Sequence, residues 1–263
     1  MVGAVISFNF VFLAWSSEEK PSPRVLKKVG HPPIFEEYAW LLWRFVDDDG
    51  TVRYQELKAR RDILDVLVEK LKDFKLSTYE SWDEKLKVAF WINTYNVLTL
   101  RVVIDNYPIR ASFLGSLRFP HNSVRQIPGV WDELQFRVMG RDLTLDDIEH
   151  SIIRSEFREP RIHMALVCAA MSCPPLRSEP YSGENLDTQL DDQTRIFLRN
   201  KQRFYIDRGQ KRVYLSKIFD WYGKDFIASY GEENEGDIKS SVLSFVGSYL
   251  DQSDRKYLEE FGK

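Results

Sequence analysis

The chain has 263 residues, of which 43% are hydrophobic and 14% aromatic, enough to bury one sizeable core. Its formal net charge is -3, so charge gives no argument for a nucleic-acid partner. Its two cysteines cannot form the disulfide framework that staples small secreted proteins. Composition therefore excludes a basic nucleic-acid-binding protein and a disulfide scaffold, and favours a globular domain.

Residues 1–16 contain the apolar run VGAVISFNFVFLAW. The run is too short for a membrane span but fits the hydrophobic region of a secretory signal, with Ala14 and Ser16 at small-residue positions before a cut. No Lys or Arg precedes it, so an uncleaved membrane anchor and a core strand remain alternatives. We expect export to the periplasm or outside the cell, with membrane association through this segment, or a cytoplasmic protein if it is not a signal. Residues 17–33 are polar and proline-rich and predict a linker.

The first predicted helix is Phe35–Val46, where apolar residues recur at helical spacing. Asp47-Asp48-Asp49-Gly50 resembles a calcium loop, but a phenylalanine stands where the first acidic ligand belongs, so the motif predicts only a turn into a short strand at residues 51–54. Gln55–Phe74 repeats leucine and isoleucine at helical spacing and predicts one long amphipathic helix.

The next helix is predicted to start at Ser81, with Glu84 completing a capping box. Its middle, Val88–Leu100, is apolar on most faces, which predicts a buried central helix. Asn93 and Asn96 interrupt that apolar stretch one turn apart. A buried amide without partners costs about 1–3 kcal/mol. We therefore expect both to belong to a polar network, either tying loops down through backbone hydrogen bonds, the favoured role, or binding a ligand.

Residues 110–130 predict a long loop, and Leu134–Leu143 predicts a hairpin around a glycine turn. Thr144 is the best helix-start signal in the chain, because two aspartates follow it in the first turn. This helix should stop before Pro160, since the residue before a proline avoids the α region.

Pro160 suits the first position of a second helix, from Arg161 to about Ala170. This segment is apolar nearly all round, which predicts a buried core helix, with a central strand as the alternative. Ser172-Cys173-Pro174-Pro175 should end it in a rigid loop.

The residues able to carry chemistry are Glu149, His150, His163, Cys168 and Cys173. A carboxylate, an imidazole and a thiol are the parts of an activated nucleophile. Apolar neighbours predict that Cys168 is buried and inert, whereas Cys173 lies in a loop and should be reachable. A helix C-terminus raises the pKa of a thiol, so Cys173 needs an imidazole beside it to react. We prefer His163 as that partner, with Glu149 orienting it.

Three other interpretations of the same residues remain open. A polar cluster that only packs the fold or binds a ligand is the favoured one. A zinc site is disfavoured, because His163, Cys168 and Cys173 are five residues apart and lack the short-knuckle spacing of structural zinc sites. A local disulfide between the two cysteines is the less favoured state for them. No metal and no cofactor is expected.

The remaining pattern predicts a helix around Leu186–Phe197, a second hairpin through residues 204–215, a short helix capped by Ser216, and a last helix at Asp237–Leu250 before a charged tail. We find no internal repeat. The tally predicts an α+β fold: a mainly helical single globular domain, residues 34–263, with two small β-hairpins and a buried central helix.

Three runs, AFWINTYNVLTL, LTLDDIEHSIIR and EPRIHMALVCAAMSCPPLRSEPYSGENLDTQLDD, make the chain resemble the family called domain of unknown function 547. The resemblance spans roughly residues 54–222 and implies a single globular domain, without implying a reaction. The positions that match its motifs are Asn93, Tyr95, Asn96, Asp146, Glu149, His150, His163, Cys168, Ser172, Cys173 and Pro174.

Two functions follow as expectations. The first is a thiol-dependent hydrolase or acyl transferase with Cys173 as nucleophile, His163 or His150 as base, Glu149 or Asn93 as orienter, and backbone N–H groups near Ser172 stabilising an oxyanion. The alternative is a non-catalytic binding module of the cell envelope for a peptide or small metabolite, with Asn93, Asn96 and Ser172 as ligand-binding residues. An enzyme needs a thiol within reach of an imidazole at an open cleft, whereas a binding module needs only the cleft.

Overall fold

The structure is a computed structural model that describes residues 32–110, 119–120, 122–168, 173–231 and 237–261. The first part contains η1 (Pro33–Phe35), α2 (Glu36–Phe45), α3 (Tyr54–Ala59), α4 (Arg61–Lys72), α5 (Leu76–Glu80), α6 (Glu84–Asn106) and η2 (Val124–Gln126). The middle contains β1 (Phe136–Val138), β2 (Arg141–Leu143), η3 (Asp147–Ile153), α8 (Arg154–Glu156), η4 (Pro160–Met164) and α9 (Leu186–Arg199). The last part contains β3 (Phe204–Asp207), β4 (Arg212–Leu215), α10 (Ile218–Trp221), η5 (Gly223–Phe226), α11 (Ile227–Tyr230), α12 (Ile238–Ser248) and α13 (Gln252–Phe261).

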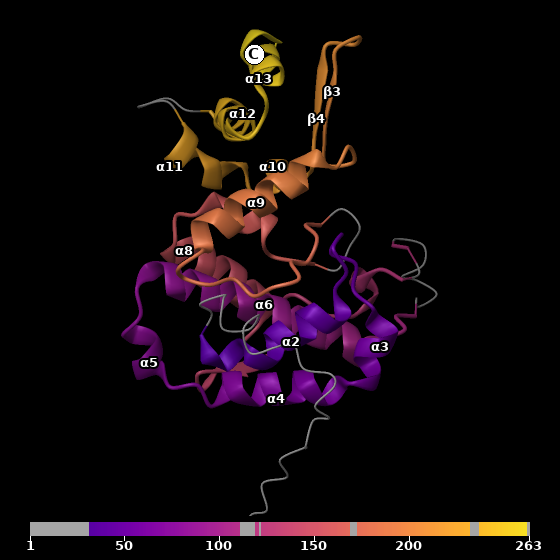
Figure 1. Ribbon diagram of the computed structural model, residues 1–263, viewed down its shortest axis with the longest axis vertical. Coiled ribbons are helices and arrows are strands. Elements are labelled where there is room, and N and C mark those ends of the chain that lie inside the picture. The colour runs from indigo at the N-terminus through magenta and orange to yellow at the C-terminus, as the bar shows by residue number, and fades with distance from the viewer. Residues whose placement is uncertain (1–31, 111–118, 121, 169–172, 232–236, 262–263) are drawn as a thin grey trace, which may run out of the picture.

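Two apolar cores organise these elements. The first gathers buried side chains from α2, α4, α6 and η3, which lie together in Figure 1 with α9 above them. The second gathers side chains from η5, α12 and α13 at the other end of the molecule. Helix α9 serves both cores, because Leu190 packs in the first and Phe197 in the second. The mainly helical α+β fold with two small antiparallel strand pairs is confirmed.

The buried central helix is α6. Its N-cap is Asp83, whose side chain accepts a hydrogen bond from Leu86 N at 2.8 Å, so the predicted cap at Ser81 is wrong by two residues. The helix ends before Tyr107-Pro108, as expected for a residue that precedes proline. Between these ends, sixteen of its residues are buried on almost every face. Such a helix leaves no polar face, so its own polar side chains must find partners inside the protein.

Asn93 and Asn96 find these partners in two loops. The amide of Asn93 donates to Tyr181 O at 2.8 Å and accepts from Tyr181 N at 2.9 Å. The amide of Asn96 donates to Ala165 O and accepts from Val167 N, both at 3.0 Å. Each asparagine therefore replaces the backbone partner that the loop would have had in a sheet. The favoured role, tying loops to the central helix, is confirmed.

Both predicted hairpins are present, with β1 paired to β2 and β3 paired to β4 in antiparallel register. The first turns through Met139 and Gly140, whose φ angles are 50° and 75°. Two positive φ angles in a two-residue loop match the twist of the flanking strands, and a glycine adopts this conformation freely. The predicted strand at residues 51–54 is reduced to a single bridge between Val46 and Val52.

The single long helix predicted at Gln55–Phe74 is wrong, because the chain breaks between α3 and α4 at Arg60, where φ is -119° and ψ is 37°. A continuous apolar stripe would need an apolar residue at position 60 or 61, and both are arginine. The Arg60 guanidinium instead lies over the Trp40 ring, 5.4 Å from its centroid.

The core helix predicted at residues 161–170 is also wrong. The chain makes the short 3-10 helix η4, its last helical hydrogen bond runs from Leu166 N to Ile162 O at 2.9 Å, and residues 166–168 are not helical. Ala165 O and Val167 N, which an α-helix would have used, are both taken by Asn96. A long-range side-chain contact thus overrides the local apolar pattern, and residues 169–170 lie outside the described part of the chain.

The prediction that the helix at Asp237–Leu250 is the last one is wrong, because α13 forms within the charged tail that follows it. Tyr257 and Leu258 are buried on its inner face, and Leu258 belongs to the second core. Across the described ranges, no helix has both the length and the hydropathy needed to span a membrane.

Candidate functional site

Glu149 and His150 are positioned by an unusual helix. Thr144 Oγ1 accepts a hydrogen bond from Asp147 N at 3.0 Å, and Asp147 Oδ2 accepts one from Thr144 N at 2.9 Å, so the predicted N-cap is confirmed. The following segment, η3, is a π-helix in which Arg154 N donates to Glu149 O, five residues back. The wider turn directs Glu149 inward, where it is 8% exposed, and His150 outward. π-Helical turns of this kind are frequent at functional sites.

The Glu149 carboxylate lies against two tyrosines. The Tyr95 hydroxyl, from α6, donates to Glu149 Oε2 at 3.1 Å. Burial and the nearby Glu149 charge raise the pKa of Tyr95 and that of Tyr222, so both hydroxyls stay protonated and act as donors. A buried carboxylate can remain in place here because donors face it.

His163 lies on η4 and is 3% exposed. Its Nε2 is 2.8 Å from Asp225 Oδ2, and its ring stacks on Tyr222 with centroids 4.0 Å apart at 16°. Burial lowers the pKa of His163 from its ordinary value of 6.5, despite the neighbouring carboxylates. The imidazole is therefore neutral at pH 7 and donates its Nε2–H to Asp225.

Asp225 on η5 holds its charge through Arg154. The guanidinium binds it at two points, Nε to Oδ2 at 2.6 Å and Nη2 to Oδ1 at 2.9 Å. Burial alone would raise the pKa of Asp225, but the hydrogen bonds from His163 and Arg154 outweigh it and hold that pKa well below its ordinary value. Because Arg154 supplies the positive charge, Asp225 stays ionised without a charged His163. We call Tyr95, Glu149, Arg154, His163, Tyr222 and Asp225 the buried polar cluster.

His150 lies at the rim of this cluster. Arg154 Nη1 approaches its Nδ1 at 2.9 Å, and its Nε2 is 3.8 Å from Asp146. His150 is exposed and has no cysteine among its partners. The carboxylate that orients His163 also differs from the prediction. His163 is hydrogen-bonded to Asp225, which sequence reasoning missed, and not to Glu149.

The two cysteines do not lie beside this cluster as free thiols. Cys168 and Cys173 form a disulfide, with Cα atoms 5.9 Å apart, which lies within the normal range. The expectation that they stay unpaired is wrong, because η4 ends at Met164 and neither Cys168 nor Cys173 lies in a helix. Cys168 is partly exposed rather than buried, as is Cys173. In this state Cys173 has no thiol with which to act as a nucleophile.

Two of the three predicted ligand-binding residues, Asn93 and Asn96, have their side-chain amides engaged within the fold. Asn93 and Asn96 are 0% and 1% exposed, and both ends of each amide are bound to backbone groups. Ser172 lies outside the described residues. Among the residues that the structure describes, no three of His, Cys, Asp and Glu are arranged to hold a metal ion.

The chemistry open to the buried polar cluster is limited by its burial. A neutral imidazole bound to an ionised carboxylate is the base-and-orienter half of a catalytic group. The imidazole, however, is stacked under Tyr222 and nearly inaccessible. What the cluster does directly is join α6 to η3 through Tyr95 and Glu149, and join α8 and η4 to η5 through Asp225.

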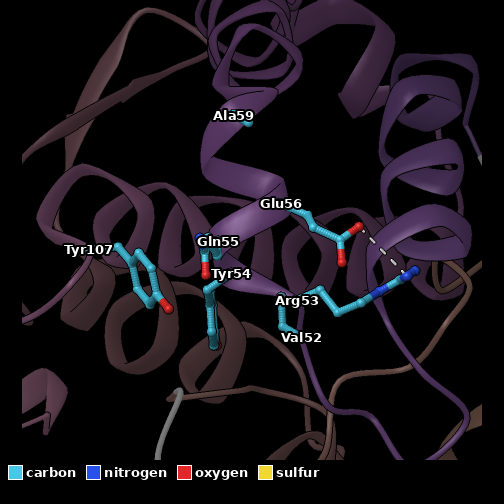
Figure 2. A pocket seen from close by; sticks show the side chains of 7 residues that line it. All are labelled: Val52, Arg53, Tyr54, Gln55, Glu56, Ala59 and Tyr107. Carbon is cyan, nitrogen blue, oxygen red and sulfur yellow. Dashed lines mark ion pairs between the residues drawn. The ribbon is translucent and has the colours of Figure 1, made fainter.

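A hollow of about 560 Å³ lies elsewhere, where α3 begins and α6 ends. Figure 2 shows the rings of Tyr54 and Tyr107 next to each other, with Gln55 and Glu56 beside them on α3. The two ring centroids are 5.9 Å apart at 28°. The other residues that line it are Val52, Arg53 and Ala59, and none of its lining residues belongs to the buried polar cluster.

A second hollow, of about 820 Å³, lies along α4 and is lined by Pro33, Ile34, Asp65, Val66, Glu69, Lys70, Asp73, Phe74, Lys75 and Thr78. Sequence reasoning missed both hollows. Tyr54 and Tyr107 are far apart in the chain, and no local pattern signals that their rings meet.

The comparisons with known proteins agree with the motifs in the sequence. Residues 79–198 match the model of one family, described as "Protein of unknown function, DUF547". The match is shorter than the resemblance read from the motifs, and it leaves Tyr54, Tyr222, Asp225 and most of the second core outside it. No curated protein and no solved structure matches the chain. Residues 79–198, which carry Glu149, His163 and both cysteines, are therefore the part of the chain that is similar to the DUF547 family.

Proposed function

We propose that this protein is a non-catalytic binding module that takes a short peptide segment in the hollow at Tyr54 and Tyr107. The observation that carries the proposal is the pair of near-parallel tyrosine rings in a concave, solvent-open part of the surface. Binding sites are typically concave and combine aromatic walls with a few polar groups. This hollow has both.

Each part of the lining has a partner in a peptide. The faces of Tyr54 and Tyr107 offer flat apolar area for a proline or aromatic ring. Burial raises the pKa of Tyr54 to about 12, so its hydroxyl is a donor at neutral pH. The exposed Gln55 side chain can both donate to and accept from a peptide group. Glu56 is held between Arg44 and Arg53 at 3.6 and 3.7 Å, which balances the charge at that end.

The test titrates the isotope-labelled protein with the capped tripeptide Ac-Pro-Tyr-Pro-NH2. Binding is monitored by the changes in the chemical shifts of the backbone amides. We expect shifts at residues 52–59 and at Tyr107. Replacing Tyr54→Ala should weaken binding about threefold to tenfold, since an aromatic pair contributes about 0.5–1.5 kcal/mol.

A matched control exists on the hairpin β3–β4. Tyr205 and Tyr214 also stack, with centroids 6.1 Å apart at 23°, but both are exposed on a projecting hairpin and line neither hollow. Tyr205→Ala should leave the affinity unchanged. Equal losses in both variants, or no shifts at residues 52–59 up to the solubility limit of the peptide, would refute the proposal.

A thiol-dependent hydrolase or acyl transferase is the second candidate, and the His163–Asp225 pair is the observation that favours it. It requires a reduced Cys173 activated by His163. In the reduced protein, His163→Gln should then slow iodoacetamide labelling of Cys173, whereas the binding proposal predicts equal rates. The comparison decides between the two candidates without any substrate.

We also propose that the protein acts outside the cytoplasm, in the cell envelope. The apolar segment within residues 1–16 and the disulfide both support export, since disulfides persist in oxidising compartments. Protein taken from its native host should begin near Ser17 or remain tethered to a membrane. Cytosolic protein whose N-terminal sequence still begins at Met1 would refute this proposal.

A further inference from the structure

The disulfide Cys168–Cys173 has the features of a site that can be opened in the folded protein. Both of its residues are partly exposed, so the bond lies near the surface of the folded protein, where thiol–disulfide exchange can begin. They are only five positions apart in the chain. Closing such a small ring restrains the unfolded chain less than closing a long loop, so the bond stabilises the fold less than a long-range disulfide would.

The chain on both sides of the disulfide is held without it. On the N-terminal side, Asn96 binds Ala165 O and Val167 N at 3.0 Å. On the C-terminal side, Gln193 Nε2 donates to Pro175 O at 2.6 Å. Opening the S–S bond therefore leaves both flanks attached to α6 and α9.

The C-terminal flank also contacts the turn that leads into the hollow. Gly50 has φ +82°, and a Cβ there would lie 2.4 Å from Pro175 Cβ and 2.9 Å from Leu176 O. Only a glycine allows this approach. From Gly50 the chain continues through the Val46–Val52 bridge into Arg53 and Tyr54 of the hollow. Any change in the position of Pro175 would therefore act directly on the turn that leads into the hollow.

We propose that Cys168–Cys173 is a reversible thiol–disulfide site, opened in the folded protein by dithiols, and that its state is transmitted through Pro175 and Gly50 to the hollow. A dithiol attacks one sulfur as its thiolate, breaks the Cys168–Cys173 bond and forms a mixed disulfide. Its second thiol then displaces the protein sulfur, leaving two protein thiols and the oxidised, cyclic reductant. The functional consequence, a change in peptide affinity, rests on the proposed function. The redox step and the movement of the turn do not.

The first measurement compares the rate of reduction by dithiothreitol in native buffer and in urea. A site open in the folded state should be reduced natively at a rate within about tenfold of the rate in urea. If reduction required global unfolding, the rate in native buffer would be at least about 10³-fold lower than in urea. In native buffer at most about one molecule in 10³ is unfolded at any time. A ratio of that size would overturn the proposal.

The second measurement follows backbone amide shifts on reduction, with no peptide present. Residues 51–56 should shift, and the double variant Cys168→Ser/Cys173→Ser should reproduce the reduced spectrum there. Amides of the hairpin β3–β4 should stay fixed and serve as the internal control. Fast reduction without any change in the amide shifts of residues 51–56 would refute the proposal that the state of the disulfide is transmitted to the hollow. Because no peptide is used, failure here is distinct from failure of peptide binding.

Discussion

At the scale of single residues, the asparagines of α6 have the clearest effect. Asn93 and Asn96 stand one turn apart and each forms two hydrogen bonds with a loop from a different part of the chain. A buried amide pair of this kind fixes where the loops cross the helix. Its loss leaves backbone groups buried without partners.

Replacing Asn93→Leu or Asn96→Leu should each lower the free energy of unfolding by about 1–3 kcal/mol, because two backbone groups lose their partners in each variant. Urea midpoints measure the effect. Asn106→Leu is the control: Asn106 ends the same helix, is exposed and bonds only to Val102 O, and the change should cost less than about 0.5 kcal/mol. Unchanged urea midpoints in the first two variants would mean that the hydrogen bonds of Asn93 and Asn96 do not stabilise the fold.

His163 makes stability depend on pH. Burial places the folded-state pKa of His163 below 6.5. Between the two pKa values, therefore, His163 is protonated in the unfolded chain and neutral in the folded chain. Stability should therefore fall as pH drops from about 7 through 6.5 toward the folded-state pKa. The pKa of Asp225 is also lowered, but from 3.8, so its stabilising effect is lost only at more acidic pH.

The measurement is the free energy of unfolding between pH 7 and pH 5. His163→Gln keeps a side-chain N–H for Asp225 and should flatten the slope, whereas His150→Gln, at an exposed position, should leave it. A slope retained in His163→Gln would assign the pH dependence to another group.

At the scale of elements, the turn at Gly50 shows how one glycine joins two parts of the chain. Gly50→Ala should destabilise the protein through both the positive φ, costing about 1–2 kcal/mol, and the clash with Pro175, costing about 1–3 kcal/mol more. Gly140→Ala is the matched control, since Gly140 has φ +75° and nothing within 4 Å of the added Cβ. Thermal unfolding of both variants separates the two effects. Equal losses would show that the Pro175 contact carries no energy.

The local pattern of the sequence predicted the elements whose own residues decide their form: α2, α6, α9 and both hairpins. It failed where a distant side chain decides, as at residues 165–167, whose backbone groups are taken by Asn96. The break at Arg60 and the helix α13 had weaker local signals, namely two arginines in the apolar stripe and the pair Tyr257-Leu258 among charges. Of the candidate site, Glu149 and His163 were placed in one cluster correctly. Asp225 could not be found, because nothing near it in sequence marks it as the partner of His163.

At the scale of the whole molecule, the buried polar cluster lies where the two apolar cores meet. Arg154 and His163 come from segments of the DUF547 region, and Asp225 comes from the C-terminal part beyond it. The cluster therefore fastens the second core to the region that matches the family model. This role accounts for its burial without requiring a reaction.

Asp225→Asn removes the charge that Arg154 and His163 share, and should lower the free energy of unfolding by about 1–3 kcal/mol. Hydrogen exchange should rise in α12 while α6 stays protected, because the C-terminal core loses its attachment first. The exposed pair Arg208–Asp254 is the control, and Asp254→Asn should cost less than about 1 kcal/mol. Uniform exchange throughout Asp225→Asn would contradict the fastening role.

We propose that ligand binds in the hollow at Tyr54 and Tyr107, and that the buried polar cluster holds the fold together. The most direct test is the affinity for Ac-Pro-Tyr-Pro-NH2 measured side by side in the folded variants Tyr54→Ala and His163→Gln. We expect Tyr54→Ala to bind about threefold to tenfold more weakly and His163→Gln to bind as the parent protein does. The reverse pattern, with affinity lost in His163→Gln and kept in Tyr54→Ala, would contradict the account.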